Sequence, residues 1–313
     1  IAHEKLDDAI FKLTPNPSSG TISGGTWTIG DPQIVTTVDG AASATWTLHY
    51  EVTKTSTTTL SGKEGPYNTQ EEANAAAEAA KNNAIAQLQT EAQAMVDAAI
   101  AEAKAQLAKI TIDYEETTVP HGFDPTDSSS GSVSVPSNGS TTAVVANQPW
   151  QAHVTWEKRD ALTGGLVDAD TTFEIQEWNP EKGEYEKSTH YQVVRREDGK
   201  YTVHLIGDAF FEGWEGKQGV LYYHQANQGK YRIVELKAPA SYNLKAWEHN
   251  NWVIGWSEEI IVHPDYPTYE FLGETASRNM PYKTKVIIKK VDDALSAKGF
   301  FRFIQEIILV VKE

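Results

Sequence analysis

The sequence predicts a mainly β protein made of two tandem antiparallel sandwiches, the first of which carries a long Ala-rich helical insertion. Through residues 150–285, short β-branched and aromatic runs alternate with turn signals such as Asn179-Pro180 and Asp198-Gly199. A second set of the same motifs occurs within residues 1–149. Between its two halves, residues 69–109 are rich in Ala and contain neither Gly nor Pro.

Length and composition limit the possible functions. The 313 residues are enough for about two domains, and the formal net charge of −16 argues against nucleic-acid binding. The absence of Cys excludes disulfides, a Cys-based zinc site and a Cys nucleophile. The nine His residues lie in different predicted elements, so we expect no metal and no cofactor. No stretch is long and apolar enough to insert into a membrane.

In the predicted second domain, residues 150–285, apolar and polar residues alternate as they do in half-buried strands. Phe173 and Ile175 share one strand face, and Tyr201, Val203 and Leu205 continue the pattern in a later strand. Regularly spaced short strands of this kind are typical of a Greek-key sandwich.

The insertion at residues 69–109 opens on a capping box, Thr69 to Glu72. As one helix it would be about 60 Å long. We expect its apolar stripe to pack on the β domain or to fold back as a hairpin near Asn82-Asn83; a partner-binding coiled coil is the alternative. The larger apolar residues recur at helical intervals of three and four positions or their multiples: Ile85, Leu88, Met95 or Val96, Ile100 and Leu107.

Three residues of the second domain form a candidate reactive set. Alternation points Lys158 inward with Val154 and Trp156, and Glu235 inward with its strand neighbours. A buried amine loses its proton readily and becomes a nucleophile, and a buried carboxyl can move protons. The carboxamide of Asn279 would be the electrophile, and the expected product is a Lys–Asn isopeptide bond formed once, with loss of ammonia.

The motifs around these residues resemble those of a known family. Lys-x-Asp at Lys158, Glu-x-x-Ala-Pro-x-x-Tyr at Glu235 and Asn-x-Pro at Asn279 occur in the order found in Cna B-type domains of Gram-positive surface adhesins and pilins, particularly SpaA-like ones. The resemblance covers residues 150–292 well and most of residues 1–149 more loosely. It implies two tandem Ig-like (Cna B-type) sandwiches, in an extracellular protein of the cell wall or cell surface.

The first domain repeats two members of the set, Glu116 and Asn147. Glu116 shares a strand face with Ile112 and Tyr114, whereas Glu115 should face solvent. From Asn147 to Lys158 there are 158 − 147 = 11 positions, and from Asn279 to Lys290 there are 290 − 279 = 11. We therefore expect two domain junctions of the same design.

The ends of the chain leave two alternatives open. Lys158 precedes Phe173 by 173 − 158 = 15 positions, so the corresponding lysine of domain one, counted back from Phe11, would lie upstream of residue 1. Residues 286–313 are either the first strands of a further domain or a donor strand. In the first case the chain is cut from a longer array; in the second, Lys290 bonds to Asn147 of the next molecule and builds a head-to-tail filament.

These features predict a structural stalk or shaft segment of an adhesin or pilus-like filament. It would hold an adhesive tip that meets a host or matrix ligand, and its partners would be adjacent domains or subunits. The alternative is a carbohydrate- or matrix-binding module, because Trp247, Trp252 and Trp256 are bunched, as are Tyr222 and Tyr223. A multiple-turnover enzyme is the weakest of the three classes, so the only chemistry expected is single-turnover bond formation.

Overall fold

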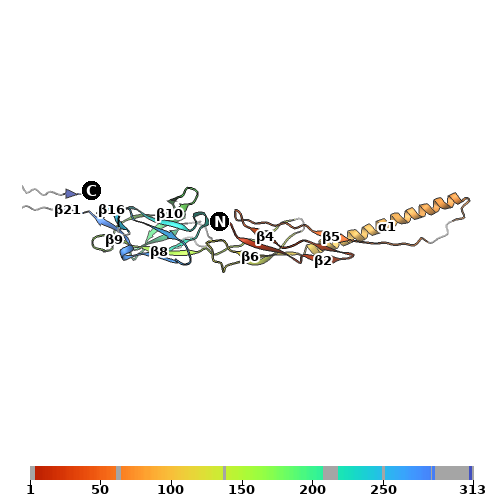
Figure 1. The fold of residues 1–313 in the computed structure, drawn as a ribbon, viewed down its shortest axis with the longest axis horizontal. Coiled ribbons are helices and arrows are strands. Elements are labelled where there is room, and N and C mark those ends of the chain that lie inside the picture. Colours follow the sequence, from red (N-terminus) through yellow and green to blue (C-terminus); the bar gives the residue numbers. More distant parts are fainter. Residues whose placement is uncertain are drawn as a thin grey trace, which may run out of the picture. The chain divides into compact units, whose positions relative to one another are not determined.

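The computed structural model describes residues 4–60, 65–136, 139–206, 218–248, 251–282, 284–285 and 310–311. The chain divides into two compact units: the N-terminal unit, Lys5–Gln148, and the C-terminal unit, Pro149–Glu313 with Ile1–Glu4. Both are built mainly of β-strands, and the one long helix of the described residues belongs to the N-terminal unit (Figure 1). The predicted mainly β class is confirmed.

The N-terminal unit contains a four-stranded and a three-stranded antiparallel sheet. The first has the order β4-β1-β6-β7 and the second the order β2-β3-β5. Gly24 closes the β2-β3 hairpin with a φ of 78°, which other residues adopt only with strain. The strands are β1 (Ile10–Asn16), β2 (Ser19–Ile22), β3 (Gly25–Thr28), β4 (Gln33–Thr36), β5 (His49–Val52), β6 (Thr111–Thr118) and β7 (Ser130–Ser134).

The insertion is a single helix, α1 (Gln70–Leu107), of 38 residues. Its N-terminus is capped as predicted: Thr69 Oγ1 accepts a hydrogen bond from the Glu72 N–H at 3.1 Å. The Glu72 carboxylate accepts one in return from the Asn68 N–H, one residue earlier than in the usual box. Because the helix runs through Asn82 without interruption, the expected hairpin there is wrong.

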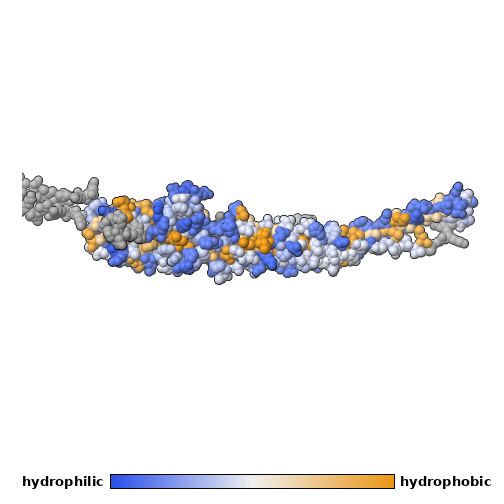
Figure 2. Space-filling view, in the orientation of Figure 1, coloured by the Kyte–Doolittle hydropathy of each residue, from blue (hydrophilic) through white to orange (hydrophobic). Residues whose placement is uncertain are grey.

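The C-terminal part of α1 packs on the three-stranded sheet through small residues. Ala99 and Ala103 are buried there with Trp27, whose Nε1 donates to Gln106 Oε1 at 2.6 Å. The expected packing on the β domain is therefore confirmed for this part, but Ile85 and Met95 are 43% and 44% exposed. The buried face is the Ala face, since small side chains let a helix lie close to a sheet. The surface of α1 in Figure 2 is accordingly mixed, with hydrophobic among hydrophilic residues.

The described residues of the C-terminal unit form four sheets. One has the order β11-β10-β15-β18; a second has the order β12-β13-β8-β14, with β19 parallel to β8. A third has the order β17-β16-β20-β9, and β21 pairs with β22. The strands are β8 (Gln151–Trp156), β9 (Lys158–Asp160), β10 (Thr172–Asn179), β11 (Glu184–Lys187), β12 (Tyr191–Arg195), β13 (Tyr201–Leu205), β14 (Val220–Tyr222), β15 (Lys230–Lys237), β16 (Tyr242–Glu248), β17 (Asn251–Ile254), β18 (Ser257–Ile261), β19 (Thr268–Phe271), β20 (Ser277–Pro281), β21 (Thr284–Lys285) and β22 (Val310–Val311), with 3₁₀ turns η1 (Gln225–Asn227) and η2 (Gly273–Thr275).

The core of the C-terminal unit lies where the β8 sheet meets the β10 sheet. Trp156 of β8 and Phe173 of β10 contact edge to face, with ring centroids 5.5 Å apart, and Tyr201 of β13 contacts both rings. Such ring pairs favour these offset and edge arrangements. The alternating pattern that predicted inward-facing Phe173, Ile175, Tyr201, Val203 and Leu205 is confirmed, since all five are buried.

The two units repeat one pairing in detail. In the N-terminal unit Phe11 of β1 lies opposite Glu116 of β6, and in the C-terminal unit Phe173 of β10 lies opposite Glu235 of β15. In both pairs the register shifts immediately before the Phe. The separation is 116 − 11 = 105 positions in the first unit and 235 − 173 = 62 in the second. The excess of 105 − 62 = 43 is close to the 38 residues of α1, so the helix is an insertion into a repeated strand pair.

Candidate functional site

Three strands bring Lys158, Glu235 and Asn279 together. Lys158 opens β9, Glu235 lies near the end of β15, and Asn279 lies in β20. Strands β9 and β20 run parallel, with Ser277 opposite Lys158. The chain reaches this pairing by a break at Glu157, after which it passes from the β8 sheet to the β20 sheet. A strand near the start of the unit, β9, thus meets a strand near its end, β20, at this site.

One carboxyl group contacts both of the other functional groups. Glu235 Oε1 lies 3.5 Å from the Lys158 Nζ, and Glu235 Oε2 accepts a hydrogen bond from Asn279 Nδ2 at 3.0 Å. The amine and the amide nitrogen are therefore held on the two oxygens of a single side chain. This is the position that a proton carrier between them requires.

The site is dry. Lys158, Glu235 and Asn279 are 1%, 2% and 0% exposed, which confirms the inward orientation predicted from alternation. Burial removes the hydration of the ammonium and lowers the pKa of Lys158 to about 8. The negative charges of Glu235 and Asp160 act in the opposite direction and raise this pKa in part. At pH 7 a pKa of about 8 leaves roughly a tenth of the amine neutral, far more than for an exposed lysine, and the neutral amine is the nucleophile.

Ser277 completes the site, and the sequence reasoning did not identify it. Its backbone carbonyl accepts a hydrogen bond from Lys158 Nζ at 3.2 Å, and its Oγ donates to Glu235 Oε2 at 3.3 Å. The residue is 0% exposed. The available signal was its place two positions before Asn279 on the same strand face.

Glu116 and Asn147 form a second, similar pair in the N-terminal unit. Asn147 Nδ2 donates to Glu116 Oε2 at 3.0 Å, and the Ser129 N–H donates to the same oxygen at 3.0 Å. Glu116 is 4% exposed while Glu115 is exposed, as alternation predicted. Asn147 also donates to the Asp127 carbonyl at 3.2 Å. Lys290, the remaining predicted site residue, lies outside the described residues.

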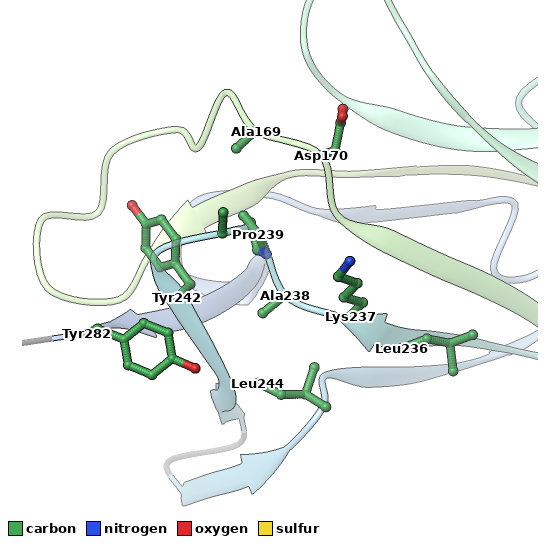
Figure 3. Close-up of a pocket in the computed structure, with 10 residues that line it drawn as sticks. Ala169, Asp170, Leu236, Lys237, Ala238, Pro239, Tyr242, Leu244 and Tyr282 are labelled. Atoms are coloured by element: carbon green, nitrogen blue, oxygen red, sulfur yellow. The ribbon is translucent and has the colours of Figure 1, made fainter. Parts of the chain in front are cut away.

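The aromatic residues that favoured carbohydrate binding are largely core residues. Trp256, Tyr222 and Tyr223 are buried, and the side chains of Trp247 and Trp252 lie outside the described part. An open groove of about 610 Å³ does lie beside the end of β15 (Figure 3). It is lined by Ala169, Asp170, Leu236, Lys237, Ala238, Pro239, Ala240, Tyr242, Leu244 and Tyr282.

The described residues contain no group of three His, Asp or Glu side chains placed to hold a metal ion. Among the helices described, none has the length and apolar character to cross a membrane.

Solved structures similar to this chain are pilins. A variant of shaft pilin SpaA from Lactobacillus rhamnosus GG is 12% identical, with 55% of this chain and 69% of that chain covered and a TM-score of 0.23. Another SpaA variant is 11% identical, with coverages of 88% and 85% and a TM-score of 0.23. A streptococcal ancillary pilin is 16% identical, with coverages of 54% and 41% and a TM-score of 0.20.

The other comparisons give no match: no family model fits the chain, and no curated protein matches it. At TM-scores this low, function has to be argued from the side chains of the chain itself.

Proposed function

We propose that this chain is a stalk or shaft segment of a cell-surface adhesin or pilus-like filament, and that its C-terminal unit locks itself with an isopeptide bond between Lys158 and Asn279. The observation that carries the proposal is the buried Glu235 carboxyl, whose oxygens lie 3.5 Å from the amine and 3.0 Å from the amide nitrogen. In keeping with the motif resemblance, both units are Cna B-type, Ig-like sandwiches, of which residues 1–149 and 150–285 are the two domains and residues 286–313 begin a further element.

The chemistry uses only groups of this site. Neutral Lys158 Nζ attacks Cγ of Asn279, and a C–N bond forms. Glu235 takes up a proton from the attacking amine at the oxygen that faces it and delivers one to Nδ2 through the oxygen that Nδ2 already contacts. The bond from Cγ to Nδ2 then breaks, and ammonia leaves. The chain gains one amide cross-link and loses one ammonia, and because Lys158 is consumed, the reaction occurs once.

The same contacts fit a covalent role better than a purely structural ion pair. An isolated buried Lys–Glu pair has to recover the hydration lost by both charges and often fails to stabilise a fold. Here Lys158 and Glu235 side chains are both 0% exposed, and a carboxamide that can react with the amine lies beside them. Joining Lys158 to Asn279 removes the ammonium charge, and Glu235 is left protonated when ammonia leaves, so that no buried charge remains.

Intact-mass measurement of the unfolded protein tests the proposal. The wild-type chain should be lighter than its sequence mass by one ammonia for this unit, and peptide mapping should recover a branched peptide joining Lys158 to Asn279. Glu235→Ala should fold but retain the ammonia. Glu157→Ala is the matched control: Glu157 is also a buried carboxylate of this unit, but it pairs with Arg159 and should leave the bond intact. A Glu235→Ala protein that still carries the branched peptide would refute the assigned role.

A further inference from the structure

We propose that the hydrogen bond between Tyr242 and Asp160 is a clamp that positions β20 for the bond-forming reaction. Both would be positioning residues, because they act on Lys158 and Asn279 without exchanging atoms with them. The inference rests on the proposed function, since it assigns two further side chains to the same site. The contacts that carry it lie on strands β9, β16 and β20, all in the C-terminal unit.

The clamp joins the two strands that flank β20. The sheet has the order β17-β16-β20-β9, so β16 and β9 lie on opposite sides of β20. Tyr242 opens β16 and lies opposite Pro281 of β20. Asp160 ends β9 and lies opposite Asn279. Tyr242 Oη donates to Asp160 Oδ2 at 3.0 Å, so this hydrogen bond spans the strand that carries the reacting carboxamide.

Both ends of the clamp are held by backbone groups. Asp160 Oδ1 accepts hydrogen bonds from the Leu162 N–H at 2.7 Å and the Thr163 N–H at 2.9 Å, which form a side-chain turn at the end of β9. The Tyr242 N–H donates to the Ala240 carbonyl at 2.9 Å, and the Tyr242 ring stands on the wall of the open groove (Figure 3). Because both residues are already held, forming the clamp orders little further chain.

The clamp lies on the reactive face of this sheet. Alternate residues of a strand share a face, and directly paired residues of neighbouring strands do so as well. Asp160 follows Lys158 by 160 − 158 = 2 positions and pairs with Asn279, so the three side chains point to one face. The Asn279 carbonyl also accepts a hydrogen bond from the Ala161 N–H at 2.9 Å, at the start of the Asp160 turn. The position of Asn279 relative to the amine therefore depends on this turn, and a displacement of about 1 Å can slow a reaction about a hundredfold.

The clamp also keeps Asp160 ionised. Burial by itself raises the pKa of this carboxyl, but the N–H groups of Thr163 and Leu162 and the Tyr242 hydroxyl outweigh burial, so the pKa is lowered. Asp160 therefore carries a negative charge near neutral pH, on the strand face that it shares with Lys158.

Two negative charges of the described residues act on the Lys158 amine: Glu235 of β15 and Asp160 of β9. Desolvation lowers the pKa of Lys158, and both charges raise it in part. Strand β20 presents the uncharged Ser277 and Asn279 on the same face. Removing the Asp160 charge should lower the pKa of Lys158 further, so that a larger share of the amine is neutral at a given pH. The clamp thus acts on the pH range of the reaction as well as on its geometry.

The rate of ammonia loss after refolding, followed by intact mass at a series of pH values, tests the clamp. Tyr242→Phe keeps the ring but removes the hydroxyl, and it should reach the wild-type final mass about tenfold more slowly at every pH. Tyr269→Phe is the matched control and should react at the wild-type rate, because its hydroxyl donates to the Ile261 carbonyl at 2.8 Å, outside the clamp. A Tyr242→Phe protein that reacts as fast as wild type overturns the inference.

Asp160→Asn separates the charge from the hydrogen bond, and it decides the question if Tyr242→Phe folds poorly. An Asn side chain can still bond to the Tyr242 hydroxyl, but removal of the charge should move the pH of half-maximal rate to a lower value. Asp168→Asn is the control and should not move it, since that carboxylate is 92% exposed and pairs with Arg195. A residue with a purely structural role would leave this pH unchanged, so an unshifted profile in Asp160→Asn also overturns the inference.

The wild-type protein separates the inference from the proposed function. If wild type loses ammonia and yields the Lys158–Asn279 branched peptide, while the Tyr242 and Asp160 variants behave as their controls do, only the clamp is overturned. If wild type keeps its ammonia, the proposed function is refuted and the clamp with it.

Discussion

Because Lys158 is buried, the stability of a C-terminal unit that lacks the isopeptide bond should depend on pH in the alkaline range. The pKa of Lys158 falls from 10.5 to about 8 on folding, mainly because the ammonium is desolvated. Between these two values the unfolded chain binds a proton that the folded chain does not, so stability rises with pH in this window. Below pH 8 both states are protonated, and the full penalty of the buried charge is constant.

The corresponding measurement compares two variants that cannot form the bond, Asn279→Ala and Asn279→Ala with Lys158→Met. The single variant should gain on the order of 3 kcal/mol between pH 8 and pH 10.5 relative to the double variant. Urea denaturation at a series of pH values gives the difference between their free energies of unfolding. A difference that does not change with pH would mean that Lys158 is not desolvated.

Ser277 should act as a positioning residue for the reaction. Its Oγ donates to Glu235 Oε2 at 3.3 Å, while its backbone carbonyl, which holds Lys158, is kept in Ser277→Ala. We expect that variant to reach the same final loss of ammonia about tenfold more slowly after refolding, equivalent to about 1.4 kcal/mol in the barrier. Time-resolved intact mass measures the rate. Thr275→Ala removes a hydroxyl that, among the described residues, donates to the Leu272 carbonyl, and it should not change the rate.

The sequence sufficed to predict the candidate residues but not all their contacts. Alternation along a strand correctly separated Glu116 from Glu115 and placed Lys158 and Glu235 inside. Alternation places Ser277 on the face of Asn279, but it does not give the contact with Lys158, which depends on the parallel register of β9 and β20. That register is fixed by residues more than a hundred positions apart.

At the scale of elements, α1 should be held to its unit by its Ala face. Ala103 is 0% exposed against the three-stranded sheet, and Ala101 on the same helix is exposed. Ala103→Glu buries a charge with no partner and should destabilise the N-terminal unit by about 3 kcal/mol or more. Ala101→Glu adds the same charge and should stay within about 0.5 kcal/mol of wild type. Thermal unfolding of the two variants provides the test, and equal melting temperatures would contradict the packing.

The helix also illustrates a limit of periodicity arguments. Its capping box and its length were predicted, because both depend on local sequence. The prediction that Ile85 and Met95 lie on the buried face is wrong, because smaller residues of the helix make the contact. Where a helix lies close to a sheet, the side chains at the contact must be small, and Ala residues carry little signal in an Ala-rich sequence.

For the molecule as a whole, the proposed bond should dominate the stability of the C-terminal unit. It closes a loop of 279 − 158 = 121 positions, and a cross-link over that length contributes about 5 kcal/mol through the entropy of the unfolded chain. Wild type should therefore exceed the Asn279→Ala, Lys158→Met variant by about that amount. Separate unfolding transitions measured by calorimetry should show no change in the N-terminal unit. If the two free energies of unfolding differ only by what a core substitution costs, the result argues against a cross-link.

The mainly β class and the repeated strand pair were predictable, because both depend on alternation and motif spacing. The division of the first strand into β8 and β9, which pair with different sheets, was not. It depends on a break at Glu157 that is held by distant backbone groups, the carbonyl of Phe271 and the N–H of Ser277.

The parallel pairing of β9 with β20 bears on how far such a segment can be stretched. Tension applied through the two ends of the C-terminal unit would pass directly from Lys158 to Asn279 once these are joined. The 121 positions between them, about 400 Å of extended chain, would be withheld from elongation. A force–extension trace of the linked unit should lack that step, and Glu235→Ala should restore it. A shaft assembled from such units would keep a fixed length under load.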